Sequence, residues 1–407
     1  MKKITVLSLV AVLCLITIDE GQSQDRKRVR DLGIHPGILS PGPWNAITDV
    51  EGVLVGHQTL IEGDGIRTGV TAILPHNGNL FRDRVPAAVF VGNGFGKALG
   101  FTQVVELGEL ETPIALTNTL SIFNVAHGVA DYVLKQEGNE NVRSVNPVVG
   151  ETNDGWLNDI RARVVDTDDV YQAIQSAKTG MVAEGNVGAG TGTRALGFKG
   201  GIGTSSRKLP ENRGGYTVGV LVQSNFGGIL TIDGVPVGEM LGNHYMSSKV
   251  GDESIYSTNE ASPDTKQDFI VKSDDGYDYD VDGSVMIIVA TDAPISSRNL
   301  ERLAKRAFMG IVRVGGIASN GSGDYVIAFS THPGVRNNID SESRTRQVTE
   351  LINDVMSPLF LAAIEATEEA ILNSLFMAET MEGDEGRIQE AIPVDEVLKL
   401  MGKEVKE

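Results

Sequence analysis

A glycine–serine pair, Gly283-Ser284, stands immediately before a short apolar segment and is the first candidate for chemistry. The segment, Val285 to Ala290, is rich in Val and Ile and is bounded by turn residues, which predicts a fully buried strand. A helix from Ser296 or Ser297 to Phe308 and a second strand from Tyr325 to Phe329 are predicted to follow. Strand, helix and strand would return the polar loop at 320–324 to the layer of Ser284, which predicts a site there.

Serine needs a base, and the histidines do not offer one. No two of the six lie at metal-ligand spacing, and there is no HExxH motif or Gly-x-Ser-x-Gly elbow. His332 follows the far end of the second strand. A serine can instead use its own α-amine if it becomes the first residue of a chain, because the pKa of about 8 suits a general base once the preceding peptide bond is cut. Gly283 favours such a cut because it has no side chain to block the attack.

Two polar segments at predicted strand ends are further candidates. The segment 148–160 places Glu151 and Trp156 after an apolar strand end, where α/β folds often bind ligands. Its alternative is an Asn-Asp-Gly turn whose side chains bond their own backbone. Asn225 follows the strand Tyr216 to Val222 and could offer its amide NH₂ to a developing negative charge, or could only cap a turn.

Two motifs that resemble ligand loops fail on inspection. Gly92 to Lys97 lacks the glycine of a dinucleotide fingerprint at Lys97 and the hydroxyl residue of a P-loop at Ala98, so a turn from strand into helix is favoured. Asp278 to Gly283 matches the first half of a calcium loop, but Val289 stands where a bidentate Glu is needed. We therefore expect no metal and no cofactor. The calcium loop nevertheless leaves a rival reading, a secreted non-catalytic protein that binds calcium or another ligand.

The N-terminal segment and the net charge indicate where the protein acts and which partners are unfavourable. Residues 1–23 combine Lys2 and Lys3 with a short apolar run, which predicts a signal peptide and a secreted or periplasmic protein. The single cysteine, Cys14, lies in this segment, so the mature chain would have no thiol. A net charge of −19 argues against nucleic acid or an anionic membrane as partner. Without a linker between two halves, we expect one large α/β domain.

The C-terminal third predicts a long helical region. Its wide apolar stripe runs from Leu351 to Ile371 and is typical of a helix that packs on a sheet or at a subunit interface. Pro358 interrupts the stripe and is expected to kink the helix or to divide it.

Five segments together resemble the DmpA-like family of L-aminopeptidase/D-esterases, which includes the β-peptidyl aminopeptidases. They are VVGETNDGWLNDI, EGNVGAGTGT with GFKGGIGTSSR, VLVQSNFG, DGSVMIIVATDAP and NGSGDYVIAFSTHPG. The likeness spans the chain from Arg30 to about Thr331 in one order. It implies an αββα sandwich that resembles the N-terminal-nucleophile hydrolases with different connectivity, and a homo-oligomer, commonly a tetramer.

The resemblance also implies residue roles. Ser284 would become the nucleophile after self-cleavage behind Gly283, which leaves chains 24–283 and 284–407 within one domain. Ser322 and Asp324 would hold Ser284 and its amine.

On the substrate side, the resemblance implies that Asn225 supplies the oxyanion hole, that Glu151 binds a free amino group and that Trp156 lines the pocket. The expected function is a serine aminopeptidase acting on small peptides, amides or esters with a free amino group. A related self-cleaving acyltransferase is a third reading.

Overall fold

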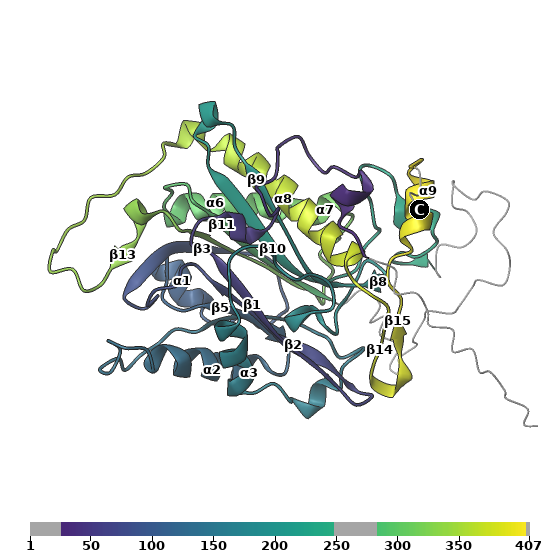
Figure 1. The fold of residues 1–407 in the computed structure, drawn as a ribbon, viewed down its shortest axis with the longest axis horizontal. Coiled ribbons are helices and arrows are strands. Elements are labelled where there is room, and N and C mark those ends of the chain that lie inside the picture. Colours follow the sequence, from purple (N-terminus) through teal and green to yellow (C-terminus); the bar gives the residue numbers. More distant parts are fainter. Residues whose placement is uncertain (1–25, 248–282, 404–407) are drawn as a thin grey trace, which may run out of the picture.

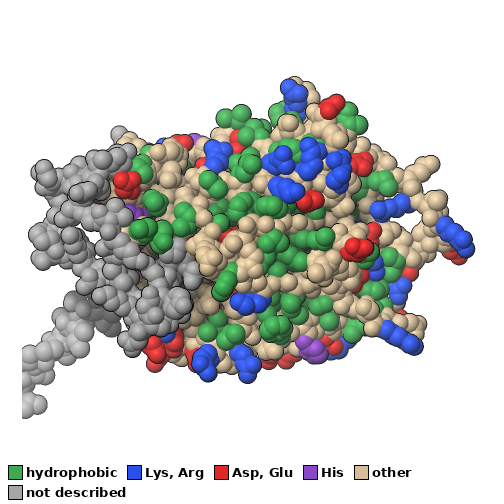
Figure 2. Space-filling view, turned by 180° about the vertical axis from the view of Figure 1, so that it is seen from behind, with side chains coloured by type: hydrophobic (Ala, Val, Ile, Leu, Met, Phe, Trp, Pro, Cys, Tyr) green, Lys and Arg blue, Asp and Glu red, His purple; other side chains and the backbone are tan. Residues whose placement is uncertain are grey.

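The computed structural model describes residues 26–247 and 283–403. The predicted signal peptide and nearly all of the acidic segment 246–282, including Asp278 to Asp282 of the calcium-loop motif, lie outside these residues. Within the described ranges, no helix is both long enough and apolar enough to cross a bilayer. Seen from behind, the surface mixes both charge signs with apolar groups, and Lys and Arg side chains gather in places despite the negative net charge (Figure 2).

Two sheets form the centre of the molecule (Figure 1). The large sheet has the strand order β13-β3-β12-β11-β10-β9, with β4 paired to β3, and the small sheet has the order β1-β2-β5-β6. The strands of the large sheet are β3 (Asp83–Gly94), β4 (Glu109–Leu110), β9 (Gly201–Lys208), β10 (Thr217–Asn225), β11 (Ser284–Thr291), β12 (Gly323–Ser330) and β13 (Asn337–Asn338). Those of the small sheet are β1 (Leu54–Glu62), β2 (Ile66–Leu74), β5 (Ile114–Asn118) and β6 (Val148–Thr152).

Helices cover the outer face of each sheet. The apolar faces of α6, α7 and α8 pack on the large sheet, and those of α2 and α3 pack on the small one. The helices are α1 (Phe101–Leu107), α2 (Ile122–Leu134), α3 (Thr167–Gln175), α4 (Val237–Met240), α6 (Ser297–Ala307), α7 (Met309–Arg313), α8 (Ser357–Phe376) and α9 (Val394–Leu400). Two hairpins complete the regular structure, β7 (Arg194–Ala195) with β8 (Phe198–Lys199) and β14 (Met381–Glu382) with β15 (Ile388–Gln389). The result is the predicted four-layer αββα sandwich.

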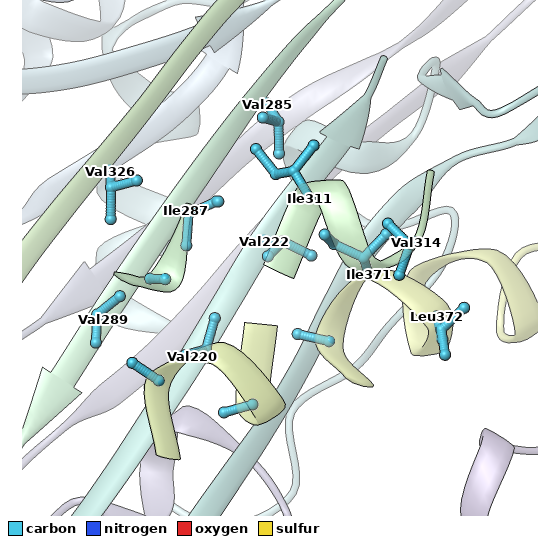
Figure 3. Close-up of a cluster of buried hydrophobic side chains, with 14 of the residues drawn as sticks. Val220, Val222, Val285, Ile287, Val289, Ile311, Val314, Val326, Ile371 and Leu372 are labelled. Atoms are coloured by element: carbon cyan, nitrogen blue, oxygen red, sulfur yellow. The ribbon is translucent and has the colours of Figure 1, made fainter. Parts of the chain in front are cut away.

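The alternation of side chains along β10 and β11 explains how the large sheet is buried on both faces. Val220 and Val222 join Val285, Ile287 and Val289 in the core beneath α7 and α8 (Figure 3). The residues between them, such as Leu221, Met286 and Ile288, face the core between the sheets. Each such side chain, when fully buried, contributes on the order of 1.5–3 kcal/mol, so the strand that begins at Ser284 is firmly fixed.

The predicted long C-terminal helix is shorter than expected. α8 begins at Ser357, and Pro358 lies in its first turn, where a missing N–H costs nothing. The chain upstream, including Leu351, is not α-helical and holds only a short 3₁₀ turn, Asn353–Val355. Pro358 therefore starts the helix instead of kinking it. The expectation that the stripe packs on a sheet is confirmed, since α8 lies against β9 and β10.

Candidate active site

Ser284 is the first residue of β11, between β10 and β12. It pairs with Asn225 across the antiparallel β10 and with Gly323 across the parallel β12. The crossover through α6 and α7 makes β12 parallel to β11, so the loop before Gly323 returns to the serine as predicted. Directly opposed residues on antiparallel strands have Cβ atoms about 4.5–5.5 Å apart on one face, so Asn225 and Ser284 are side-chain neighbours.

Gly283 fits a space that no other residue could occupy. A Cβ at this position would overlap the carbonyl oxygen of Asn225 and lie 2.7 Å from Cα of Phe226. The peptide bond between Gly283 and Ser284 is therefore pressed against the end of β10. The Gly323 N–H donates both to Ser284 Oγ and to the Gly283 carbonyl oxygen, each at 3.2 Å. One donor thus contacts the hydroxyl and the carbonyl of the same glycine–serine pair.

Ser322 and Asp324 form a pair beside this donor. The Ser322 hydroxyl donates to Asp324 Oδ1 at 2.5 Å, and Asp324 Oδ2 has no hydrogen-bond partner among the described residues. Burial raises the pKa of Asp324 to about 6, although the hydroxyl of Ser322 and the backbone N–H of Val285 act in the opposite direction. Near neutral pH the carboxylate of Asp324 can accept a further hydrogen bond.

Asn225 has its amide orientation fixed by one contact. Its Oδ1 accepts the backbone N–H of Arg194 at 3.0 Å. The NH₂ end is therefore left to donate on the face that Asn225 shares with Ser284. Sequence reasoning identified the amide but not Arg194, which lies 31 residues away along the chain.

Glu151 is buried and is the last residue but one of β6. Its Oε1 accepts the Lys97 N–H at 2.7 Å, and its Oε2 accepts the Thr119 hydroxyl. Burial raises the pKa of Glu151, and these two donors counteract the rise. The carboxylate is held by groups from two loops that precede it in the chain.

The segment 92–97, predicted only as a turn, continues β3 as far as Gly94 and brings Glu151 close to β12. A Cβ at Gly96 would lie 3.2 Å from Glu151 Oε1, 3.0 Å from Cα of Gly323 and 2.8 Å from Cε2 of Tyr325. Tyr325 donates its hydroxyl to the Gly96 carbonyl at 2.8 Å. Glu151 is thus only a few ångströms from the residue that contacts Ser284. The three glycines Gly92, Gly94 and Gly96 at the end of an apolar strand were the sequence signal that could have revealed this close packing.

The inner faces of the two sheets also meet here. A Cβ at Gly150 would overlap the side chain of Met286, so β6 and β11 approach as closely as a glycine permits. Glu151 and Ser284 stand beside this contact on their respective strands, which is why residues of the small sheet reach the nucleophile.

Trp156 follows Glu151 on the turn after β6. The guanidinium of Arg194 lies 4.7 Å from the ring centroid and that of Arg387 lies 5.3 Å from it. Trp156 therefore supports Arg194, the residue that orients Asn225. Its Nε1 is buried and has no partner in the described part of the chain.

A buried serine with an amide and a carboxylate beside it, at the meeting point of two sheets, defines a serine hydrolase with an N-terminal-nucleophile type of fold. The chain belongs to Peptidase family S58, which it matches over residues 45–389. It is a serine aminopeptidase. This membership decides against the non-catalytic binding protein as a reading of the sequence.

Known relatives and solved structures are similar to this chain over nearly its whole length. It is 39% identical to the β-peptidyl aminopeptidase BapA of Sphingosinicella microcystinivorans, over 98% of this chain and 97% of that protein. A Burkholderia sp. β-aminopeptidase is 40% identical with a TM-score of 0.79, over 92% of this chain and 98% of that one.

The structure of the L-aminopeptidase D-Ala-esterase/amidase of Ochrobactrum anthropi, described as a prototype of the serine aminopeptidases and a new variant of the Ntn hydrolase fold, is also similar. Its identity is 34% and its TM-score is 0.77, over 92% of this chain and 99% of that one. The predicted family and fold class are thereby confirmed.

Proposed function

We propose that the chain matures by cutting itself between Gly283 and Ser284, giving chains 24–283 and 284–407 that remain one domain. Ser284 Oγ attacks the Gly283 carbonyl carbon, and the proton passes to the departing Ser284 nitrogen, which leaves an ester. This shift already frees the Ser284 amine; water then hydrolyses the ester, which frees the Gly283 carboxylate and restores the Ser284 hydroxyl. The observation that carries this proposal is the Gly323 N–H, which contacts the attacking hydroxyl and polarises the carbonyl under attack.

In the mature enzyme, the Ser284 amine acts as base for its own hydroxyl. The hydroxyl attacks the carbonyl after the N-terminal residue of the substrate, and its proton is passed to the leaving amine through the Ser284 nitrogen. The NH₂ of Asn225 stabilises the oxyanion, and Ser322 with Asp324 holds Ser284. Water releases the acyl group and restores the enzyme.

Glu151 binds the ammonium group of the substrate, and Trp156 lines the pocket. A buried carboxylate a few ångströms from Gly323, the strand neighbour of the nucleophile, suits a free amino group, because a charge-assisted hydrogen bond is strong where water is excluded. Substrates are therefore small peptides, amides or esters with a free N-terminus. β-Aminoacyl substrates have the stronger support, because the relatives at 38–40% identity with an assigned activity carry that name.

The cellular setting belongs to the same proposal. Removal of residues 1–23 would deliver the enzyme to the periplasm or outside the cell, and we expect a homo-oligomer, a tetramer by resemblance to the family. The reaction as proposed needs no cofactor and involves no nucleic acid or membrane.

Denaturing electrophoresis with N-terminal sequencing tests the proposal. Active protein should give two bands, and the shorter chain should begin with Ser284. Ser284→Ala should remain one uncut chain without activity. A fully active wild-type protein with an intact Gly283–Ser284 bond would overturn the mechanism. A panel of aminoacyl p-nitroanilides and β-alanyl dipeptides, with and without added amine acceptors, then defines the acyl preference and separates hydrolysis from acyl transfer.

A further inference from the structure

A buried lysine lies beside the residues that orient Asn225, and the reaction proposed above does not use it. Lys199 is 0% exposed and ends the hairpin of β7 and β8, where it pairs with Arg194. Burying a cation is costly unless its donors are satisfied, so a lysine kept at this position needs a reason.

The contacts of Lys199 close a loop around Arg194. Its Nζ donates to the carbonyl oxygens of Gly190 at 3.1 Å and Gly200 at 2.9 Å. These two carbonyls stand at the two ends of the segment 190–200. The Gly200 N–H also donates to the Thr193 carbonyl at 3.1 Å. The lysine therefore ties both ends of the segment whose central N–H, that of Arg194, holds Asn225.

An acidic side chain faces the same segment. Asp154 is 2% exposed, and a Cβ at Gly192 would lie 3.0 Å from Cβ of Asp154. Burial lowers the pKa of Lys199 to about 7, and the negative charge of Asp154 counteracts this change. Burial likewise raises the pKa of Asp154 to about 7. The segment is thus held between Lys199 and the turn that follows Glu151.

The tip of the hairpin is strained. Leu196 has φ 52° and Gly197 has φ 88°, the two positive values typical of a type I′ turn, in which a leucine is unfavourable. Leu196 is nevertheless buried, and its N–H donates to the Phe226 carbonyl at 2.7 Å. A strained turn persists only where its surroundings hold it, so the anchors of this hairpin determine where Arg194 lies.

We propose that Lys199 is a positioning residue for the oxyanion hole: it fixes the segment 190–200 so that the Arg194 N–H keeps the NH₂ of Asn225 directed at the reacting carbonyl. The inference rests on the role proposed for Asn225. Lys199 should therefore affect the stability of the transition state and not that of bound substrate, because the negative charge on the carbonyl oxygen develops only as the carbonyl is attacked.

The test is a double-mutant cycle between Lys199→Met and Asn225→Ala, with kcat and KM measured on the best substrate of the panel. Lys199→Met removes the donors and keeps most of the volume. It is expected to lower kcat about tenfold or more with KM nearly unchanged, because only transition-state stabilisation is lost. In the Asn225→Ala background the same substitution should lower kcat by less than about threefold, because coupled residues are not additive.

Two further variants make the result specific. Lys199→Gln keeps an N–H donor and should recover part of kcat, and it replaces Lys199→Met in the cycle if the methionine variant does not fold. Ser205→Ala is the matched control, since Ser205 is equally buried on β9 and donates to the Ala366 carbonyl in the outer layer. Its effect, large or small, should be the same with and without Asn225.

Additive effects of Lys199→Met and Asn225→Ala on kcat, or an effect confined to KM, would overturn the inference. So would a folded Lys199→Met protein that stays uncut while Asn225→Ala is cut. If both are cut too slowly to yield mature enzyme, the slowed rate of self-cleavage is compared in the cycle instead of kcat. Failure of the proposed function is seen separately, because the wild-type protein would then show no hydrolysis dependent on Ser284.

Discussion

Asp324 and Glu151 are buried carboxylates at strand ends close to Ser284, each 1% exposed, yet they are held in different ways. Asp324, near the start of β12, takes its hydroxyl donor from Ser322 in the loop just before that strand, and keeps one oxygen unbonded within the described structure. Glu151 has both oxygens occupied, by donors from the loops at Lys97 and Thr119.

The difference teaches what each carboxylate can do. The Ser322–Asp324 pair lies at the start of β12, the strand that carries the Gly323 donor to Ser284, and the Asp324 oxygen that has no partner among the described residues can take part in proton transfer. The carboxylate of Glu151 is held in one orientation by donors from two distant segments, which suits binding of a substrate ammonium group. We therefore assign Asp324 to the chemistry and Glu151 to recognition, and three experiments test that division.

Asp324→Asn should have the largest effect. The amide lacks the negative charge that we propose holds the Ser284 hydroxyl for attack, so self-cleavage should slow on the order of a hundredfold or more. Electrophoresis of purified protein over time measures it. Asp292→Asn is the control, because Asp292 follows the opposite end of β11 and accepts the Thr217 N–H. Normal cutting of Asp324→Asn would break the comparison.

Glu151→Gln should leave self-cleavage intact, because the cut involves no substrate amine. Losing a charge-assisted bond costs about 1.5–3 kcal/mol, which is about a ten- to a hundredfold loss of kcat/KM. We expect this loss mainly as a raised KM on substrates with a free amino group. Glu106→Gln, an exposed change on α1, is the matched control. An uncut Glu151→Gln chain would mean that both carboxylates serve the same step.

Ser322→Ala should give the smallest effect, a change in pH dependence. Before the cut the Ser284 nitrogen is an amide and cannot act as a base, so the rate of self-cleavage should follow the ionisation of Asp324, falling as the pH drops through about 6 and the carboxylate is protonated. The Ser322 hydroxyl lowers this pKa, so its removal should move the midpoint to higher pH. Cleavage of freshly synthesised chain across a pH series measures both midpoints. A midpoint that does not move would separate Ser322 from Asp324.

Local pattern was enough for the elements that carry the candidate site residues. The apolar run after Ser284 gave the correct strand because period and turn residues are short-range signals, and the helix and the second strand followed in the same way. Asn225 and Glu151 were found at strand ends for the same reason. The helix predicted upstream of Pro358 was wrong because the proline starts α8 instead of bending a longer helix.

The partners of these residues could not be predicted. The donor to Glu151 is 54 residues away in the chain, the donor to Asn225 is 31 residues away, and Lys199 shows no ligand motif. Gly92 to Lys97 looked like a turn because its contacts with Glu151 and Tyr325 form only when the two sheets pack.

The sequence alone offered Ser284 as the candidate nucleophile, predicted the strand that begins with it and carried the likeness to the family. Only the tertiary structure decided which carboxylate has a free oxygen, which end of the Asn225 amide faces the serine and why residue 283 must be glycine. The reason is physical. Strand and helix signals act over a few residues, whereas hydrogen-bond orientation and steric exclusion depend on segments that meet only when the sheets pack face to face.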